Sequence, residues 1–421
     1  MTKTTTDDSL GVRPWMTSPQ TTAVMDALEA AGGPGCARFV GGCVRNSLLG
    51  AGIDDIDIAT ILAPPAVIAA VEAAGLRAVP TGVEHGTVTV VSDGRPYEVT
   101  TLRRDVETDG RRAVVAFTDD WAEDAARRDF TMNALYADRT GAIFDVTGRG
   151  VADARAGRVV FVGDPQTRLA EDYLRILRFF RFHAWYGRGL PDEAALRACA
   201  AHRDAVANLA AERISKELLK LLAAEEPRGA VALMAETGVL AVVLPGAGEL
   251  SRFNALVEIE TEQLFTNDPV LRLAALAPDD EVGTARLAER LRLSNDQRAR
   301  LVAAKGLTPP VKSWMSPREL RRAVYRLGAR AFTDRVKLAW AASRRTAATA
   351  QWRGLVALGE SWSPPPFPIT GEDVMKAGVP KGPMVGEVLR EVEDWWIDHD
   401  FIDDKFSAIE KLKAVAQGMA Y

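Results

Sequence analysis

Phe39-Val-Gly-Gly-Cys-Val-Arg-Asn46, followed by Asp54-Asp-Ile-Asp-Ile-Ala-Thr60, is the stretch of this 421-residue chain that decides the fold. The apolar run before the two glycines predicts a strand, and the residues after them predict the start of a helix. Such a turn exposes backbone N–H groups that can hold a triphosphate, and Arg45 adds a positive charge. We therefore predict that Gly41, Gly42 and Arg45 bind phosphate groups.

Two acids follow this turn. In an apolar strand, alternate side chains point to one face, so Asp55 and Asp57 are expected side by side. Two neighbouring carboxylates repel each other unless a divalent cation lies between them, which predicts a Mg²⁺ site. A third acid is expected from a neighbouring strand, and Glu98 is the best-placed candidate. The alternative is an ordinary turn with exposed strand acids.

The rest of the chain indicates an α+β protein. Strands are predicted at 37–40, 57–59, 87–92, 97–101 and 142–146, and helices at 20–31, 65–74 and 129–137. After about residue 150 the strand signals nearly vanish, and helical periodicity takes over at 166–186, 192–202 and 211–224. We predict a leader (1–20), an α/β head (21–149), and a helical neck (150–225), body (226–306) and tail (307–421). Candidate joints lie at 244–248, 307–310 and 361–368.

Composition narrows the class of protein. The 52 basic and 57 acidic residues give a net charge of −5 and a pI near 5.6, which argues against non-specific coating of nucleic acid but allows a local basic face. Three cysteines without a CxxC pair support neither a disulfide framework nor a zinc ribbon. No apolar run approaches the length of a membrane span, and the first residues lack a signal-peptide pattern. We expect a cytoplasmic protein that has no membrane segment.

The glycine turn and the paired aspartates resemble the first motif of the class II tRNA nucleotidyltransferases. That family contains the CCA-adding enzymes and bacterial poly(A) polymerases, within the polymerase-β-like superfamily. The resemblance implies that Asp55 and Asp57 bind two Mg²⁺ ions. The family usually has Asp where this chain has Asn46, so any ion pair made by that acid is in doubt.

A second stretch, Arg127-Arg-Asp-Phe-Thr-Met-Asn133, resembles the family's second motif. Asp129 and Asn133 are four residues apart at a predicted helix start, so they project from one face and offer an acceptor and an amide to a ribose. The resemblance implies that Arg128, Asp129 and Asn133 bind the ribose and phosphates of the nucleotide. Taken alone, the pattern favours a helix N-cap with flanking surface arginines.

A third stretch, Glu171-Asp-Tyr-Leu-Arg-Ile-Leu-Arg178, carries a candidate base-reading pair. Asp172 and Arg175 are three residues apart on a predicted helix, so an acceptor lies beside a planar donor. This array matches the edges of cytosine and adenine, whereas uracil and guanine leave polar groups unpaired at about 1–3 kcal/mol each. A plain intrahelical ion pair is the alternative. The resemblance implies base recognition by Asp172, Arg175 and Arg178.

Further segments carry supporting predictions. The resemblance implies a head–neck hinge at 143–150, which contains Asp145, and a neck motif at 211–218, in which Glu212 and Arg213 brace the base-reading helix. Glu171 is a third supporting acid. The polar segment 102–112 is expected to be a hairpin loop, and its presence resembles enzymes that add the complete CCA.

The predicted tail concentrates basic residues. Arginines spaced three and four apart place several positive charges on one helix face, which suits the phosphates of a tRNA arm; the candidates are Arg318, Arg321, Arg322 and Arg326. We expect a tRNA partner, the substrates CTP and ATP, two Mg²⁺ ions, catalysis by Asp55, Asp57 and Glu98, and no stable protein partner. The alternatives are a poly(A) polymerase and a non-catalytic RNA-binding protein on the same scaffold.

Overall fold

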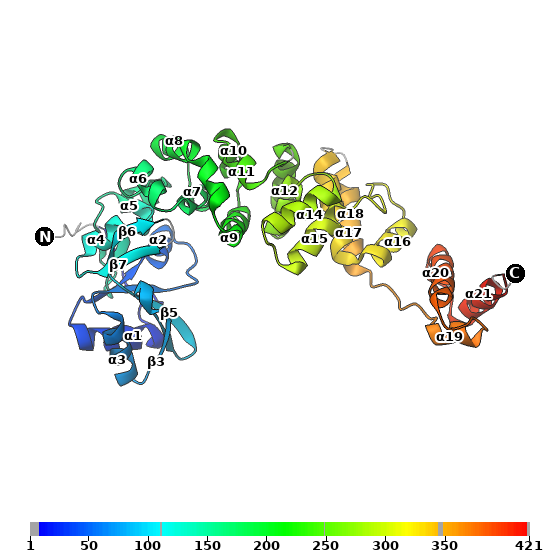
Figure 1. Ribbon diagram of the computed structural model, residues 1–421, viewed down its shortest axis with the longest axis horizontal. Helices are drawn as coiled ribbons and strands as arrows, with labels where there is room; N and C mark the ends of the chain where they lie inside the picture. The colour runs from blue at the N-terminus through cyan, green and yellow to red at the C-terminus, as the bar shows by residue number, and fades with distance from the viewer. Residues whose placement is uncertain (1–7, 110–111, 248, 344–347, 419–421) are drawn as a thin grey trace. The chain divides into compact units, whose positions relative to one another are not determined.

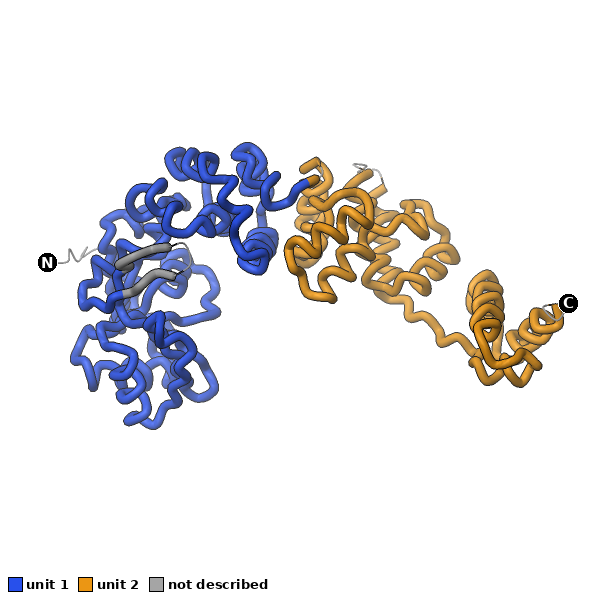
Figure 2. Tube along the Cα trace, viewed as in Figure 1, with its two compact units in different colours: residues 1–245 blue, residues 246–421 orange. Residues whose placement is uncertain are grey.

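The protein divides into two compact units in a computed structural model, Met1–Pro245 and Gly246–Tyr421 (Figure 2). The structure describes residues 8–109, 112–247, 249–343 and 348–418. The division falls in the candidate joint at 244–248. The finer predicted boundaries at 149/150, 225/226 and 306/307 stay predictions. Within the described residues, every helix is too short or too polar to cross a membrane.

The first unit is a mixed α/β head followed by helices, as expected for an α+β protein (Figure 1). Its elements are α1 (Pro19–Gly32), β1 (Ala37–Val40), α2 (Gly42–Leu49), β2 (Asp57–Thr60), α3 (Pro64–Ala73), β3 (Arg77–Gly82), η1 (Val83–His85), β4 (Thr87–Ser92), β5 (Arg95–Thr101), β6 (Arg103–Asp109), β7 (Arg112–Phe117), α4 (Trp121–Ala126), η2 (Thr131–Asn133), β8 (Leu135–Ala137), β9 (Ile143–Asp145), α5 (Gly150–Ala156), α6 (Pro165–Glu171), α7 (Leu174–Tyr186), α8 (Glu193–Ala201), η3 (Arg203–Asn208), α9 (Ala211–Leu222), α10 (Arg228–Glu236) and α11 (Val239–Val243).

The head is built on a seven-stranded sheet in the order β3-β4-β5-β2-β1-β8-β9. Its β2–β5 pair is parallel and its other pairs are antiparallel. Side chains alternate between two apolar clusters, because successive residues of a strand point to opposite faces. Phe39 and Ile58 belong to the large core that contains residues of α1 and α3, whereas Val40 and Ala59 belong to a smaller cluster with Ala125 of α4. The odd-numbered residues of β2 therefore face the α4 side.

Two expectations about the head are wrong. The predicted leader is part of the folded unit from residue 8 onward: Leu10 and Met16 are buried, and the Leu10 N–H donates to the Gly141 carbonyl at 2.8 Å. The predicted helix at 129–137 is a 3-10 turn, η2, followed by strand β8. The reason is tertiary, because β8 pairs with both β1 and β9.

Helices α6, α9 and α10 pack against α7. Six apolar side chains on α7 are buried, and its Phe179 and Phe182 lie against Phe130 of the head. The predicted helix at 166–186 is interrupted: α6 ends at Glu171, Asp172 has an extended backbone, and α7 starts at Leu174. This break decides where the base-reading candidates lie.

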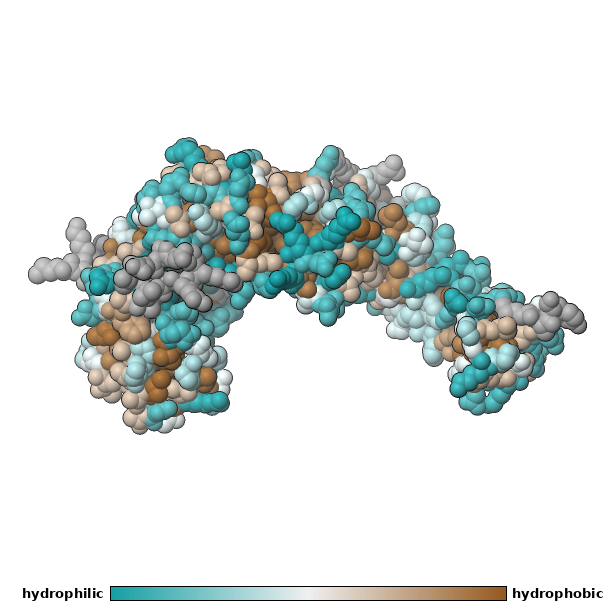
Figure 3. Space-filling model, viewed as in Figure 1, coloured by the Kyte–Doolittle hydropathy of each residue, from teal (hydrophilic) through white to brown (hydrophobic). Residues whose placement is uncertain are grey.

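The second unit is entirely helical in its described residues. Its elements are α12 (Leu250–Glu262), α13 (Pro269–Leu276), α14 (Glu281–Arg290), α15 (Asn295–Lys305), α16 (Pro317–Leu327), α17 (Ala329–Ser343), α18 (Thr349–Ser361), α19 (Gly371–Lys376), α20 (Pro383–Asp398) and α21 (Lys405–Gly418). The last three share an apolar cluster that includes Val374, Val388 and Leu412. The surface over α14 and α15 is largely hydrophilic in Figure 3, in keeping with their charged sequences.

Candidate active site

The glycine turn shapes one wall of the site. Gly41 has φ +70°, a conformation that favours glycine, and it is the N-cap of α2. The turn sends α2 back across the sheet and buries Arg45, whose side chain is 6% exposed. Arg45 donates to the side-chain oxygens of Asn133 and Asn46 and to the Tyr186 hydroxyl. All these acceptors are neutral, and Asp129 is an acid whose charge acts on Arg45.

The predicted carboxylates meet at the β2–β5 pair. Asp57 lies directly opposite Glu98 in the parallel register, and both side chains point to the α4 side of the sheet, because their neighbours Ile58 and Val99 belong to the large core. Burial and the Glu98 and Asp55 carboxylates together raise the pKa of Asp57 to about 6, although the Arg128 guanidinium acts in the opposite direction. Asp55 precedes β2 rather than lying in the strand, which corrects one detail of the prediction.

Mg²⁺ fits this donor set. Within the described residues, no three His, Cys, Asp or Glu side chains converge into a ready-made metal cage. Mg²⁺ does not require one, because it is commonly held by one or two carboxylates, water and the phosphates of a substrate. Burial and then the repulsion from Glu98 and Asp55 raise the Asp57 pKa, and a bound cation would counteract both effects. Asp55 and Asp57 could therefore hold Mg²⁺ together with a nucleotide.

An unpredicted acid positions the second motif. Asp124, on α4, is 1% exposed and accepts hydrogen bonds from Arg127, Arg128 and the Tyr136 hydroxyl. Burial alone would raise its pKa, but the two guanidinium groups and the hydrogen bonds outweigh burial and hold the pKa at about 2. Asp124 thus fixes Arg128 beside the glycine turn. The only hint in the sequence is the i,i+3 and i,i+4 spacing from Asp124 to the two arginines.

Asp129 and Asn133 lie side by side, as predicted, but the segment is a 3-10 turn and not the predicted helix. The Asn133 amide donates to Asp129 at 3.0 Å, and Arg178 of α7 donates to the other carboxylate oxygen, its Nε at 2.8 Å. Burial raises the pKa of Asp129, but Arg178 and Asn133 together bring it to about 2. Asp129 is therefore ionised, and its contact with Arg178 links the head to α7.

Asp172 and Arg175 are not paired with each other. Because Asp172 lies in the break before α7, its carboxylate accepts from the Leu174 N–H at 3.0 Å and from Arg213 of α9 at 2.8 Å. Arg175 instead donates to Glu171 at 2.5 Å and to the carbonyls of Arg168 and Arg127. The predicted side-by-side pair on one helix face is wrong. Both side chains are nevertheless held in fixed positions at the start of α7.

Comparisons with known proteins agree with this geometry. Residues 37–160 match the poly(A) polymerase head domain, and residues 191–250 match a probable RNA- and SrmB-binding site of polymerase A. The chain is 34% identical to the mitochondrial CCA tRNA nucleotidyltransferase 1 of Mus musculus, over 89% of this chain and 86% of the relative. It is 32% identical to the CCA-adding enzyme of Levilactobacillus brevis, over 88% and 91% of the two chains.

The chain belongs to the CCA-adding enzyme family. It is thereby a member of a family of tRNA nucleotidyltransferases. Among solved structures, the Bacillus stearothermophilus CCA-adding enzyme in complex with CTP aligns with a TM-score of 0.68 and 26% identity, covering 91% of this chain and 94% of that one.

The structure also places the remaining predicted residues of this member of the CCA-adding enzyme family. Asp145 accepts from the Thr147 hydroxyl and the N–H groups of Gly148 and Val151, so it shapes the entry to α5. Glu212 lies in the first turn of α9, next to Arg213. The predicted polar loop is itself a hairpin of β6 and β7, and its centre, Gly110 and Arg111, lies outside the described residues.

The predicted tRNA-binding arginines of α16 contact acids of their own unit. Arg321 pairs with Asp400, Arg322 with Asp398, and Arg326 with Asp394 at 2.8 Å. Arg318 is exposed on the same helix. Acids at the end of α20 and just after it therefore pair with three of the four predicted arginines. Their contact with tRNA stays a prediction.

Proposed function

We propose that the protein adds C, C and A to the 3′ end of tRNA, using CTP and ATP and releasing diphosphate. The observation that carries this proposal is the opposition of Asp57 and Glu98 across β2 and β5, with Asp55 adjacent and the buried Arg45 beside the same glycine turn. Nucleotidyl transfer needs this combination of carboxylates for cations and basic groups for a triphosphate.

The residues divide the work of the reaction. Gly41, Gly42 and Arg45 bind the triphosphate, while Asp129 and Asn133 offer hydrogen bonds to the ribose. Asp55 and Asp57, with Glu98 opposite, would hold two Mg²⁺ ions. Bound Mg²⁺ would lower the pKa of the primer 3′-hydroxyl and neutralise phosphate charge. The chain itself supplies orientation and a fixed electrostatic environment, so no side-chain nucleophile is required.

Base choice is assigned to Asp172 and Arg175. Each Asp172 oxygen already accepts one hydrogen bond and has capacity for another, so it can accept from the exocyclic amine of cytosine or adenine. Arg175 donates three hydrogen bonds through its Nη atoms, fewer than the five N–H groups of a guanidinium can donate. Uracil and guanine would set a carbonyl against the carboxylate and lose affinity.

We also place the reaction in a reducing, cytoplasmic compartment. Cys36, Cys43 and Cys199 are buried and unbridged, and burial raises the pKa of Cys43 to about 12. Thiols of this kind suit an environment where disulfides are not maintained.

The test is primer extension on a tRNA transcript that lacks its 3′ CCA. With Mg²⁺, CTP alone should extend the transcript by two residues, and CTP with ATP should extend it by three. A long ladder with ATP alone would instead identify a poly(A) polymerase. No extension by the wild-type protein, with tRNA binding intact, would leave a non-catalytic RNA-binding role.

A further inference from the structure

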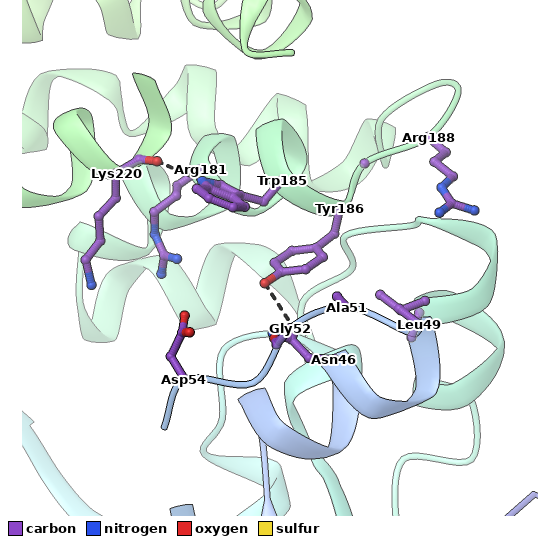
Figure 4. A pocket seen from close by; sticks show the side chains of 12 residues that line it. Asn46, Leu49, Ala51, Gly52, Asp54, Arg181, Trp185, Tyr186, Arg188 and Lys220 are labelled. Carbon is purple, nitrogen blue, oxygen red and sulfur yellow. Dashed lines mark hydrogen bonds between the residues drawn. The ribbon is translucent and has the colours of Figure 1, made fainter. Parts of the chain in front are cut away.

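Tyr186, the last residue of α7, contacts the arginine that we assign to the triphosphate. Its hydroxyl accepts a hydrogen bond from the Arg45 guanidinium at 2.8 Å, and that guanidinium lies 4.1 Å from the centre of the tyrosine ring. The hydroxyl in turn donates to the side-chain oxygen of Asn46 at 3.3 Å (Figure 4). Tyr186 therefore joins the end of α7 to α2, the helix that follows the glycine turn.

Arg45, Asn46 and Tyr186 form a closed set of hydrogen bonds. The Asn46 oxygen accepts from Arg45 Nε at 3.1 Å and from Arg45 Nη2 at 2.9 Å, and the Asn46 amide donates to the Gly52 carbonyl at 2.7 Å. The contact with Gly52 holds the amide in one orientation. The amide oxygen and the tyrosine hydroxyl together fix the plane of the guanidinium, and both are neutral groups that leave its positive charge in place.

Other contacts fix Tyr186 itself. Its ring lies 5.7 Å from the ring of Phe182, one turn back along α7, and the buried Phe182 lies against Phe130 of the head. Just after α7, the Arg188 N–H donates to the Gly157 carbonyl at 2.9 Å. A Cβ at Gly157 would lie 2.8 Å from the Tyr186 carbonyl oxygen, so the ends of α5 and α7 approach closely. None of these contacts uses the tyrosine hydroxyl, which is therefore presented from a fixed point.

Helix α7 reaches Arg45 by a second route. Arg45 also donates to the side-chain oxygen of Asn133, and the Asn133 amide donates to Asp129 at 3.0 Å. Asp129 accepts from Arg178 of α7 at 2.8 Å. Arg178 and Tyr186 are two turns apart on the helix, a distance of about 12 Å along its axis. Two points on α7 therefore determine where the Arg45 guanidinium lies, one through Asn133 and one directly.

We propose that Tyr186 is a positioning residue for triphosphate binding, a proposal that rests on the proposed function. It acts through Arg45, because its hydroxyl and its ring hold the guanidinium beside the glycine turn before a nucleotide arrives. A side chain that is already ordered loses less conformational entropy on binding, so the triphosphate binds more tightly. Since Arg45 is assigned to the phosphates and not to the base, Tyr186 supports the binding of CTP and ATP alike.

Calorimetric titration of the full chain with CTP and Mg²⁺, without tRNA, tests the role of the hydroxyl. Tyr186→Phe keeps the ring and should bind CTP about fivefold more weakly than the wild type, whereas Tyr186→Leu also loses the ring and should bind it more weakly still. The affinity for ATP should fall by the same factors. Tyr325→Phe removes a hydroxyl that donates to Glu393 in the second unit, and this matched control should bind CTP like the wild type.

A double-mutant cycle separates action through Arg45 from a general effect on packing. Arg45→Met keeps the unbranched stem and removes the guanidinium, so adding Tyr186→Phe to it should change the CTP affinity by less than about twofold. Equal losses in the two backgrounds would overturn the proposal, and so would equal CTP affinities of the wild type and Tyr186→Phe.

Extension of tRNA supplies a second readout. In Tyr186→Phe, KM for CTP and for ATP should rise, while KM for tRNA and the preference for CTP over UTP stay within about twofold of the wild-type values. A lower preference for CTP would mean that the variant displaces α7 as a whole, which would overturn a role confined to Arg45. Because the titration needs no turnover, failure of the wild type to extend tRNA would count against the proposed function alone.

Discussion

Asp57 is the head residue on which the proposed metal site most depends. Its pKa is raised to about 6 by burial, by Glu98 and by Asp55, so the protein maintains an unfavourable carboxylate there. Asp57→Asn should lower the rates of both C and A addition by about a thousandfold or more, because both share the metal site. The measurement is single-turnover extension of tRNA with each nucleotide.

The control for Asp57→Asn is thermal unfolding in Mg²⁺-free buffer. Because the substitution removes a repelled, half-buried carboxylate, the unfolding midpoint should be no lower than that of the wild type. Equal rates of C addition by variant and wild type would contradict the metal assignment.

A substitution at Arg213 tests the proposed recognition of the base. It donates to Asp172 at 2.8 Å from α9 and holds the carboxylate that we assign to the base. Arg213→Ala should lower the preference for CTP over UTP by about tenfold, and Asp172→Ala should lower it further. The measurement is kcat/KM with each of the four nucleotides. An equal loss with all four would assign Arg213 to folding or to general positioning.

Residues that act within one sequence motif were predictable, and residues brought in from elsewhere were not. Asp57 and Asn133 could be chosen because strand alternation and motif spacing place them. Tyr186 and Asp124 could not, since their partners Arg45 and Tyr136 are 141 and 12 residues away and meet them only through tertiary packing.

At the level of elements, strands with a clear alternation were the most predictable. Strands β1 and β4 have the predicted bounds, because their apolar runs are delimited by turns. The segment 129–137 has helical spacing but forms η2 and β8, since pairing with β1 and β9 outweighs local preference. The break at Asp172 was hidden within helical periodicity on both sides.

Helix α4 is an anchor for the second motif, and Asp124 carries that role. Asp124→Asn should lower the free energy of unfolding by about 3 kcal/mol at pH 7, because it leaves two partly buried arginines without the buried carboxylate that pairs with both. Denaturant unfolding of the full chain measures the change. Glu123→Gln, an exposed neighbour on α4, is the control and should change stability by less than about 0.5 kcal/mol.

The stability difference between the wild type and Asp124→Asn should depend on pH. The folded-state pKa of Asp124 is about 2, below its ordinary value of 3.8, so its contribution is fully present above pH 4 and is lost as the pH falls toward 2. The stability difference between wild type and Asp124→Asn should shrink across that window. A difference that stays constant from pH 7 to pH 3 and below would mean that the charge of Asp124 is not the source of the stabilisation.

The net charge of the whole molecule and the local charge of α16 lead to different expectations about RNA binding. The chain carries −5 overall, yet its sequence gathers arginines on α16. Sequence spacing located the basic helix correctly but could not foresee that acids around the end of α20 would face it. The surface available to RNA phosphates therefore depends on how firmly these ion pairs hold.

Removing the facing acids should expose that dependence. In Asp394→Asn, Asp398→Asn, the partners Arg326 and Arg322 are released from exposed ion pairs that contribute little to stability. If α16 binds tRNA, its affinity should rise roughly threefold to tenfold at low salt, and the slope of log affinity against log salt should steepen by about 1.5 to 2 for two added phosphate contacts. Filter binding across a salt series measures both quantities. Glu258→Gln, Glu262→Gln removes the same charge from exposed positions of α12 and should leave the slope unchanged. Equal slopes for both double variants and the wild type would mean that tRNA does not contact Arg322 and Arg326, and that these arginines join α16 to α20 instead.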